Sequence, residues 1–198
     1  MYLSRLPGAS FGLLSLQILS FFCNDLCYAN PVCTTLNIPL TATANNEVFP
    51  IPVGLNYSNP AAISALVQTV LGDANTVYPL IPTTYIGTIV ARFCEPTVKI
   101  ANRSDVVQYF VSGVTENKLY WSGLGYPTGY NGDQYSTIAY ASSQGYPTFV
   151  IDRIGVGNTS PRPDPIIQEQ VNLEEAVNHQ LVMMLKAGTA VPGKPSTS

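Results

Sequence analysis

Hydrolysis by a serine nucleophile requires a serine on a sharp turn, a histidine that accepts its proton and an acid that orients the histidine. The sequence contains one Gly-x-Ser-x-Gly segment, residues 8–12 (GASFG), and one histidine, His179. No strand is predicted before residues 8–12, and we expect them to be removed with a leader, so we interpret them as a chance match. Helical spacing places His179 about 200° around from Val177, on the solvent side of its helix. We therefore predict that this sequence contains no catalytic residue.

Metal and cofactor chemistry are not indicated either. The His, Cys, Asp and Glu residues show no metal-ligand spacing. Gly155-x-Gly157 could belong to a phosphate loop, but a dinucleotide fingerprint needs a third glycine and the start of a helix at position 160. That position is Ser160, and Pro161 follows it. We expect no metal, no cofactor and no nucleotide at this segment.

Composition indicates a globular chain that does not bind nucleic acid. Of the 198 residues, 46% are hydrophobic and 11% are charged, a balance that favours a packed core over disorder. The net charge is −3 at pH 7, so there is no basic surface that would attract nucleic acid.

Residues 1–29 have the pattern of a secretory signal peptide. Arg5 supplies a basic start, residues 11–23 (FGLLSLQILSFFC) form an apolar run, and small residues follow near Ala29. The run is shorter than the roughly 20 residues that span a bilayer. We therefore expect cleavage after Ala29 and a secreted, extracellular protein that no membrane holds. The alternative is an uncleaved leader that anchors the chain.

Secretion changes the interpretation of the cysteines. Cys23 and Cys27 would leave with the leader, which leaves Cys33 and Cys94 in an oxidising compartment. We predict that these two form a disulfide closing a loop of about 60 residues, for which chain-entropy models give on the order of 4 kcal/mol. The alternative is a pair of buried free thiols.

Three Asn-x-Ser/Thr triplets support the same compartment. They begin at Asn56, Asn102 and Asn158, and each is a candidate surface glycosylation site. Pro161 directly follows the third triplet, which argues against modification there.

Hydrophobic periodicity predicts three helices and three strands after an irregular lead-in. Residues 31–60 mix short apolar stretches with Asn and Pro and indicate little regular structure. The expected order after them is helix 59–71, strands 85–93 and 106–111, helix 133–145, strand 147–151 and helix 172–186. Alternation of strands and helices favours βαβ units and a parallel α/β sheet with right-handed crossovers.

Capping residues predict where the helices begin. Pro60 is tolerated in a first turn, Asp133 stands in an N-cap position, and Asn172 with Glu175 forms a capping-box pattern. The domain organisation that follows is a signal peptide at 1–29, a lead-in with one short helix at 30–82, a partial α/β domain at 83–190 and a disordered tail at 191–198.

The order of several motifs resembles secreted fungal α/β-hydrolases. The motifs are Tyr120-Trp121 after a strand and turn, residues 145–165 (GYPTFVIDRIGVGNTSPRPDP), and an amphipathic helix ending at Gly188. Cys33-Thr34 and residues 92–96 (RFCEP) also look like that family's N-terminal region. The resemblance covers residues 33–190 and implies the N-terminal half of an α/β-hydrolase sheet, which would be incomplete here. It also implies activity on ester or similar acyl bonds of a small substrate.

The resemblance also gives roles to two turns. The turn after the third strand of this fold supplies an N–H of the oxyanion hole, and here it is Ser112-Gly113-Val114. The family usually has histidine where this chain has Ser112, yet the backbone N–H groups of Gly113 and Val114 could still serve. The alternative is a simple turn.

The second turn follows the strand at 147–151. The resemblance makes Asp152, Arg153, Gly155 and Gly157 a structural turn that braces loops near the active-site rim.

In the family, a nucleophile elbow and the catalytic histidine come after the last predicted helix. We therefore expect a truncated member, inactive as given. The strand at 106–111 would lack its neighbour and present an apolar edge, which favours poor solubility or self-association. The alternative is a secreted, non-catalytic glycoprotein that uses the half-fold for binding or self-association.

Overall fold

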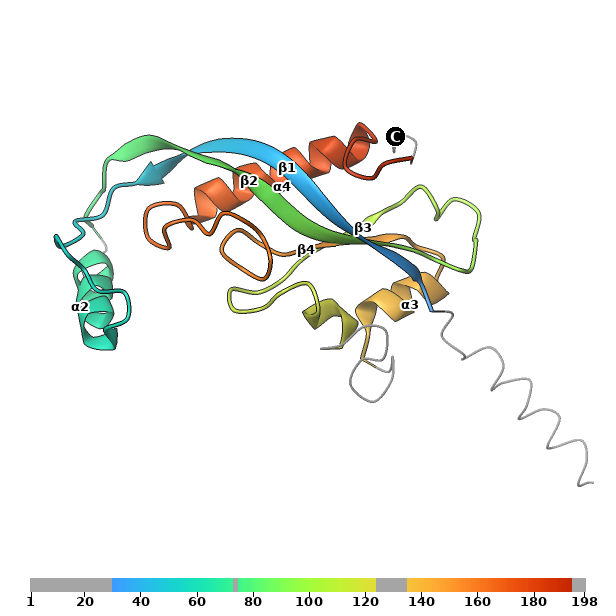
Figure 1. Ribbon diagram of the computed structural model, residues 1–198, viewed down its shortest axis with the longest axis horizontal. Helices are drawn as coiled ribbons and strands as arrows, with labels where there is room; N and C mark the ends of the chain where they lie inside the picture. Colours follow the sequence, from blue (N-terminus) through green and yellow to red (C-terminus); the bar gives the residue numbers. More distant parts are fainter. Residues whose placement is uncertain (1–29, 73–74, 124–134, 194–198) are drawn as a thin grey trace, which may run out of the picture.

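The computed structural model describes residues 30–72, 75–123 and 135–193 of the chain. They form a four-stranded mixed sheet in the order β1-β2-β4-β3, with helices packed against it (Figure 1). The protein therefore belongs to the α/β class, as predicted. The predicted leader, its Gly-x-Ser-x-Gly segment, Cys23 and Cys27 lie outside the described residues.

The long strands β1 (Val32–Glu47) and β2 (Leu80–Glu95) pair antiparallel over their whole length. The prediction of an irregular lead-in was therefore wrong. Along β1, Ile38, Leu40 and Ala42 are buried while the residues between them are exposed, which is the period of a half-buried strand. Pro39 occupies one of the exposed positions, although proline is rare inside strands. It is tolerated because β1 is an edge strand of the described sheet, where one side of the backbone needs no ladder partner.

The short strands β3 (Gln108–Val111) and β4 (Thr148–Ile151) form a parallel pair, and β4 pairs antiparallel with β2. The prediction of a parallel sheet thus holds for one neighbouring pair and is wrong for the other two. The connection between β3 and β4 contains the 3-10 turn η1 (Tyr120–Ser122) and helix α3 (Thr137–Ser143), which allows the chain to return in the same direction. Strands β1 and β2 are antiparallel, so the connection between them needs no crossover.

Helices cover both faces of the sheet. Phe149 and Ile151 of β4 share one core cluster with Leu173, Val177 and Leu181 of helix α4 (Val171–Lys186). Val150, between them in sequence, belongs instead to a second cluster with Ile138 of α3. Because neighbouring strand residues point to opposite faces, α4 and α3 lie on opposite sides of β4. His179 is exposed on α4, as helical spacing predicted.

The helix starts differ from those predicted in two of three cases. Helix α2 (Pro60–Leu71) begins as expected, with the Asn59 side chain accepting from the backbone of Ala61 at 3.0 Å. Helix α3 is capped by Ser136, whose Oγ accepts from the backbone of Ala139, while Asp133 lies outside the described residues.

Helix α4 lacks the predicted capping box. Gln170 occupies the N-cap position and makes no side-chain capping bond. The amide of Asn172 donates to the backbone oxygen of Asn45 in β1 instead, at 2.7 Å. A contact between helix and sheet has replaced the local one.

Cys33 and Cys94 face each other across β1 and β2 and form the predicted disulfide. At the other end of the chain, Ala190 and Val191 are buried in the core, so the predicted tail begins inside packed structure. None of the helices in the described ranges is long and apolar enough to cross a membrane.

Candidate functional site

The turns that follow β3 and β4 lie at the same edge of the sheet because these strands are parallel. Ser112 comes directly after β3, and Asp152 comes directly after β4. In open α/β sheets, ligands bind outside the carboxyl ends of the strands. This edge is therefore the candidate functional site.

The turn Ser112-Gly113-Val114 is anchored at its first residue. Ser112 is buried, and its Oγ donates to the backbone oxygen of Asn117 at 2.9 Å. The oxygen of Gly113 accepts from the backbone of Glu116 at 3.2 Å. Among the described residues, no hydrogen bond uses the N–H of Gly113 or Val114, and the space beside the Gly113 Cα is open. Two adjacent N–H groups thus remain able to bind an acceptor.

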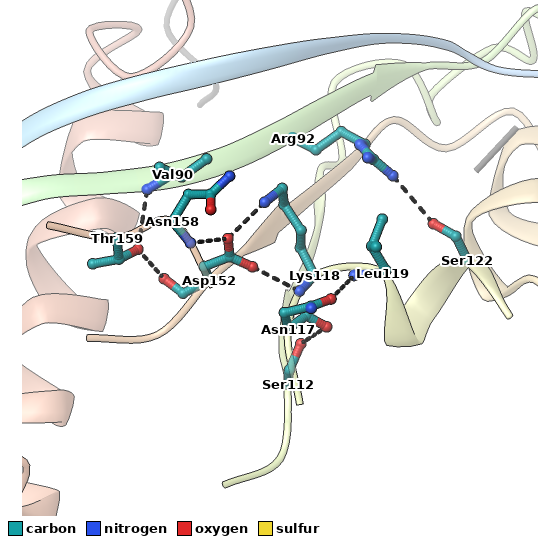
Figure 2. A network of polar contacts seen from close by, with 10 residues as sticks. All are labelled: Val90, Arg92, Ser112, Asn117, Lys118, Leu119, Ser122, Asp152, Asn158 and Thr159. Atoms are coloured by element: carbon teal, nitrogen blue, oxygen red, sulfur yellow. Dashed lines mark hydrogen bonds and ion pairs between the residues drawn. The ribbon is translucent and has the colours of Figure 1, made fainter. Parts of the chain in front are cut away.

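The carboxylate of Asp152, in the turn after β4, binds the loop after β3 that contains Lys118 (Figure 2). It is completely buried and accepts from the backbone of Lys118 at 2.8 Å and from the Lys118 ammonium at 2.6 Å. The backbone of Asn158 adds a third donor at 3.2 Å. A buried carboxylate is tolerated only when it is paired and hydrogen-bonded in this way.

The backbone of Asp152 is joined to strand β2 as well. Its N–H donates to the oxygen of Val90 at 2.9 Å, and its oxygen accepts from the hydroxyl of Thr159 at 3.0 Å. The same hydroxyl accepts from the N–H of Val90 at 3.2 Å (Figure 2). Asp152 therefore connects β2, β4 and the loop after β3.

Gly157 is required beside this carboxylate. It has a φ of +59°, and a Cβ placed on it would lie 2.3 Å from Oδ2 of Asp152. Gly155 is similar, with a φ of +75° and the Glu169 carboxylate against the position of a Cβ.

Arg153 points to a different partner. Its guanidinium lies 3.2 Å from the carboxylate of Glu174 on α4. Burial raises the pKa of Glu174 above its ordinary value, and the charge of Arg153 opposes that rise. Asp152 and Arg153 thus tie the same turn to a loop on one side and to α4 on the other.

A cavity of about 440 Å³ lies between these loops and β2. It is lined by Thr35, Val90, Arg92, Asn117, Lys118, Leu119, Asp152, Gly157 and Asn158. Gly113 and Val114 are not in this lining, and His179 is on α4. The described residues bring no serine–histidine pair to this cavity. No group of three or more His, Cys, Asp or Glu in the described part of the chain could hold a metal ion.

The side chains of Asn56, Asn102 and Asn158 are all exposed. In the third triplet, Thr159 is buried, and Ser160 exchanges two backbone hydrogen bonds with Thr88 of β2. Glycosylation at the three positions stays a prediction.

No pattern in the sequence marks Lys118 or Glu174 as part of this site. Lys118 lies in an irregular loop 34 residues before Asp152, without a pattern that marks it. Glu174 is buried because α4 docks on the sheet, which no local pattern of the sequence shows.

No protein-family model matches the chain, and no curated protein matches it by sequence. Among solved structures, a match is described as "The Atomic Resolution Structure of a Novel Bacterial Esterase". It is 14% identical, with a TM-score of 0.28, and the alignment covers 81% of this chain and 36% of that one. A TM-score this low does not establish a common fold or a common activity. The class that the structure itself defines is an α/β protein with a mixed sheet.

Proposed function

We propose that this chain forms the oxyanion-hole side of an α/β-hydrolase-like protein that cleaves ester or similar acyl bonds of a small substrate. The observation that carries the proposal is the turn Ser112-Gly113-Val114. It follows β3 directly and presents two backbone N–H groups without partners in the described residues. The resemblance of the motifs to secreted α/β-hydrolases assigns this chemistry to the same turn.

Such donors are effective because they are in place before charge develops on the intermediate. The hydrogen bond from Ser112 Oγ to Asn117 holds the start of the turn. The Asp152–Lys118 pair holds the loop that leads away from it. These contacts would supply the ordering that a histidine at position 112 provides in the family.

The proposal assigns no nucleophile and no general base to these residues. His179 is exposed on α4. The nucleophile and its histidine would have to come from polypeptide outside these 198 residues. We expect the chain as given to be inactive.

The test begins with the native polypeptide, isolated with antibodies raised against residues 30–193. It is incubated with a biotinylated fluorophosphonate, which reacts with an activated serine. We expect the native polypeptide to be labelled and the 198-residue chain to remain unlabelled. A native polypeptide that is glycosylated but unlabelled would overturn the proposal and favour the non-catalytic alternative.

A second test addresses the turn itself. In the labelled native polypeptide, Val114→Pro removes one N–H donor, whereas Val114→Ala removes most of the side chain and keeps that donor. Loss of one oxyanion-hole donor costs about 10²–10³-fold in kcat, and we expect that loss for the proline variant alone. Equal activity of the two variants would show that the turn does not bind the oxyanion.

We further propose that the protein is secreted. The Cys33–Cys94 disulfide and the exposed sequon asparagines support this. N-terminal sequencing of the protein from culture medium is the test, with a start at Asn30 expected. A cell-associated chain that begins at Met1 would contradict it.

A further inference from the structure

Helix α2 lies in the connection between β1 and β2, away from the sheet (Figure 1). Few contacts hold it. Phe49, before the helix, packs edge-to-face on Tyr78, after it, with ring centroids 5.1 Å apart. The hydroxyl of Tyr78 donates to the oxygen of Val70 at 3.3 Å, and the hydroxyl of Tyr57 donates to Asp164 at 3.1 Å. The first two contacts hold α2 to its own flanking residues, and the bond from Tyr57 to Asp164 joins this connection to the segment that precedes α4.

A groove of about 550 Å³ separates α2 from that segment, and we name it the α2 groove. Its apolar walls include Phe49, Ile63, Leu66, Val70, Pro165 and Ile166. Leu66 is the only residue of α2 that is buried, whereas Val67 and Leu71 at the same groove are 46% and 73% exposed. The apolar face of α4 shows the contrast, because its Leu173, Val177 and Leu181 are fully buried. The apolar side of α2 therefore faces space that the described residues leave open.

The charge around this groove restricts its occupant. Glu169 is the one charged residue among the described residues of the lining, and its carboxylate lies against Gly155. No Lys or Arg among the described residues lines the groove, and Asp73 is the only charged residue in the sequence from Val48 to Ala91. A charged group placed in the groove would lose hydration without gaining an opposite charge. The lining is thus complementary to an uncharged, apolar molecule.

The size of the groove indicates what kind of molecule would bind. Pockets that bind small molecules have volumes of about 300–1,000 Å³ and mostly apolar walls, and the α2 groove falls within that range. A groove of this volume accommodates one flexible chain.

We propose that the α2 groove binds the uncharged aliphatic chain of a free small molecule. The site is separate from the turn after β3, and it does not depend on the proposed hydrolase function. The apolar residues of α2 would contact the chain from one side, and Pro165 and Ile166 would contact it from the other.

The probe is 1-octanol, titrated into the folded, disulfide-bonded protein while methyl NMR signals are followed. We expect saturable shifts at Ile63, Leu66, Val70 and Ile166, and none at Val150 or Leu181 in the core. Octanoate has the same chain and a carboxylate, and it should bind about tenfold more weakly, since the lining offers it no cation. Octanoate that binds as tightly as octanol would overturn the assignment of an uncharged occupant.

Two tryptophan variants locate the site. Val70→Trp fills the groove and should abolish the octanol shifts. Gln68→Trp adds the same side chain at an exposed position of α2 outside the lining and should leave them unchanged. Unaltered signals from Val150 and Leu181 show that each variant is folded.

Other occupants would give different results, each of which overturns the proposal. A dimer that Val70→Trp dissociates in light scattering would place a second copy in the groove. Octanol shifts that do not saturate, or that both variants lose equally, would show the absence of a site. Binding to neutral lipid vesicles that Val70→Trp abolishes, with no octanol binding in solution, would assign the groove to a membrane surface.

Discussion

At the scale of single residues, the candidate site depends on Asp152. Its carboxylate receives three donors from two loops, and its backbone is bonded to β2 through Val90 and Thr159. A buried ion pair contributes little net stability compared with an apolar replacement of both partners, but removal of one partner leaves an uncompensated charge. The arrangement of the loops is therefore more sensitive to Lys118 than its place in an irregular segment suggests.

Lys118→Met should destabilise the protein by about 3–5 kcal/mol, because it leaves the Asp152 carboxylate without its counter-charge. Urea unfolding followed by circular dichroism measures the change. Lys99→Met is the matched control, because Lys99 is exposed, and it should change stability by no more than about 0.5 kcal/mol. Equal stability of the two variants would mean that the ion pair does not form in solution.

Gly157→Ala tests the contact at the same carboxylate. Alanine at a left-handed position costs about 1–2 kcal/mol in backbone energy alone, and at Gly157 its Cβ would also displace Asp152. Gly54→Ala is the control, because Gly54 has a φ of +76° and open space around it. We expect Gly157→Ala to lose more stability than Gly54→Ala in urea unfolding. Equal losses would show that the Asp152 carboxylate is free to move.

At the scale of secondary-structure elements, the β1–β2 pair is the frame to which the rest of the sheet attaches. The end of the pair at Glu47 and Leu80 leads to α2, and the opposite end carries the Cys33–Cys94 disulfide. Strand β2 then provides the edge on which β4 pairs, through residues 91–94. The short strands that bear the candidate site thus depend on the β1–β2 pair, of which the sequence predicted only β2.

Reduction of the disulfide should lower the free energy of unfolding by about 4 kcal/mol. The reason is that the reduced, unfolded chain regains the conformational freedom of a loop of about 60 residues. The comparison of unfolding curves with and without a phosphine reductant measures it. The Cys33→Ser/Cys94→Ser variant should match the reduced protein and should not respond to reductant. A wild-type curve unchanged by complete reduction would contradict this.

Helix α4 makes stability depend on pH through Glu174. Burial raises the pKa of Glu174 from its ordinary value of 4.5, and Glu169 nearby adds to the rise, while Arg153 opposes it. Burial also raises the pKa of Glu169. A raised pKa in the folded state means that folding binds a proton. Its contribution to stability is therefore complete below about pH 4.5 and is lost as the pH rises through the folded pKa.

We therefore expect Glu174→Gln to flatten the dependence of stability on pH just above 4.5, the ordinary pKa of glutamate. Glu175→Gln changes an exposed neighbour on the same helix and is the control. Urea midpoints at a series of pH values measure the effect. Burial alone would raise the pKa of Asp164, but hydrogen bonds from the backbone of Ile167 and Ile166 and from Tyr57 outweigh it and lower that pKa, so Asp164 acts in the opposite direction at lower pH. Identical pH profiles for the wild type and Glu174→Gln would refute the assignment to Glu174.

At the scale of the whole molecule, the described sheet has two edges, β1 and β3. Exposed apolar residues flank β3, with Val106 at 48% and Val114 at 79% exposure. Unprotected edges with apolar surroundings pair with other chains. We propose that the chain associates with itself through β3, as the sequence led us to expect.

Light scattering should show oligomers of the wild type that grow with concentration. Val106→Lys/Val114→Lys places a charge at each end of β3 and should shift the protein toward monomer, because edge lysines oppose strand pairing. Val53→Lys/Val77→Lys adds the same charge at two other exposed valines and should not. A wild type that stays a monodisperse monomer would contradict association through this edge.

Local patterns predicted those elements whose partners lie nearby in the sequence or whose apolar periodicity is strong. Pro60 in a first turn predicted the start of α2, and the helical spacing that placed His179 on the solvent side of α4 agrees with its exposure. Local patterns did not predict β1, where Thr, Asn and Pro39 obscure a strand that exists because β2 pairs with it. They also failed at the start of α4, where the Asn172 amide bonds to β1 instead of capping its helix.

The sequence by itself determined the α/β class, the positions of most helices and strands, the cysteine pair and the turns after β3 and β4. Only the tertiary structure decided that the sheet is mixed, that Lys118 neutralises Asp152, and that α2 leaves an apolar groove. The physical reason is the range of the interactions. Capping, turn formation and hydrophobic periodicity act over a few residues, whereas strand pairing and buried charge pairs join residues that are tens of positions apart.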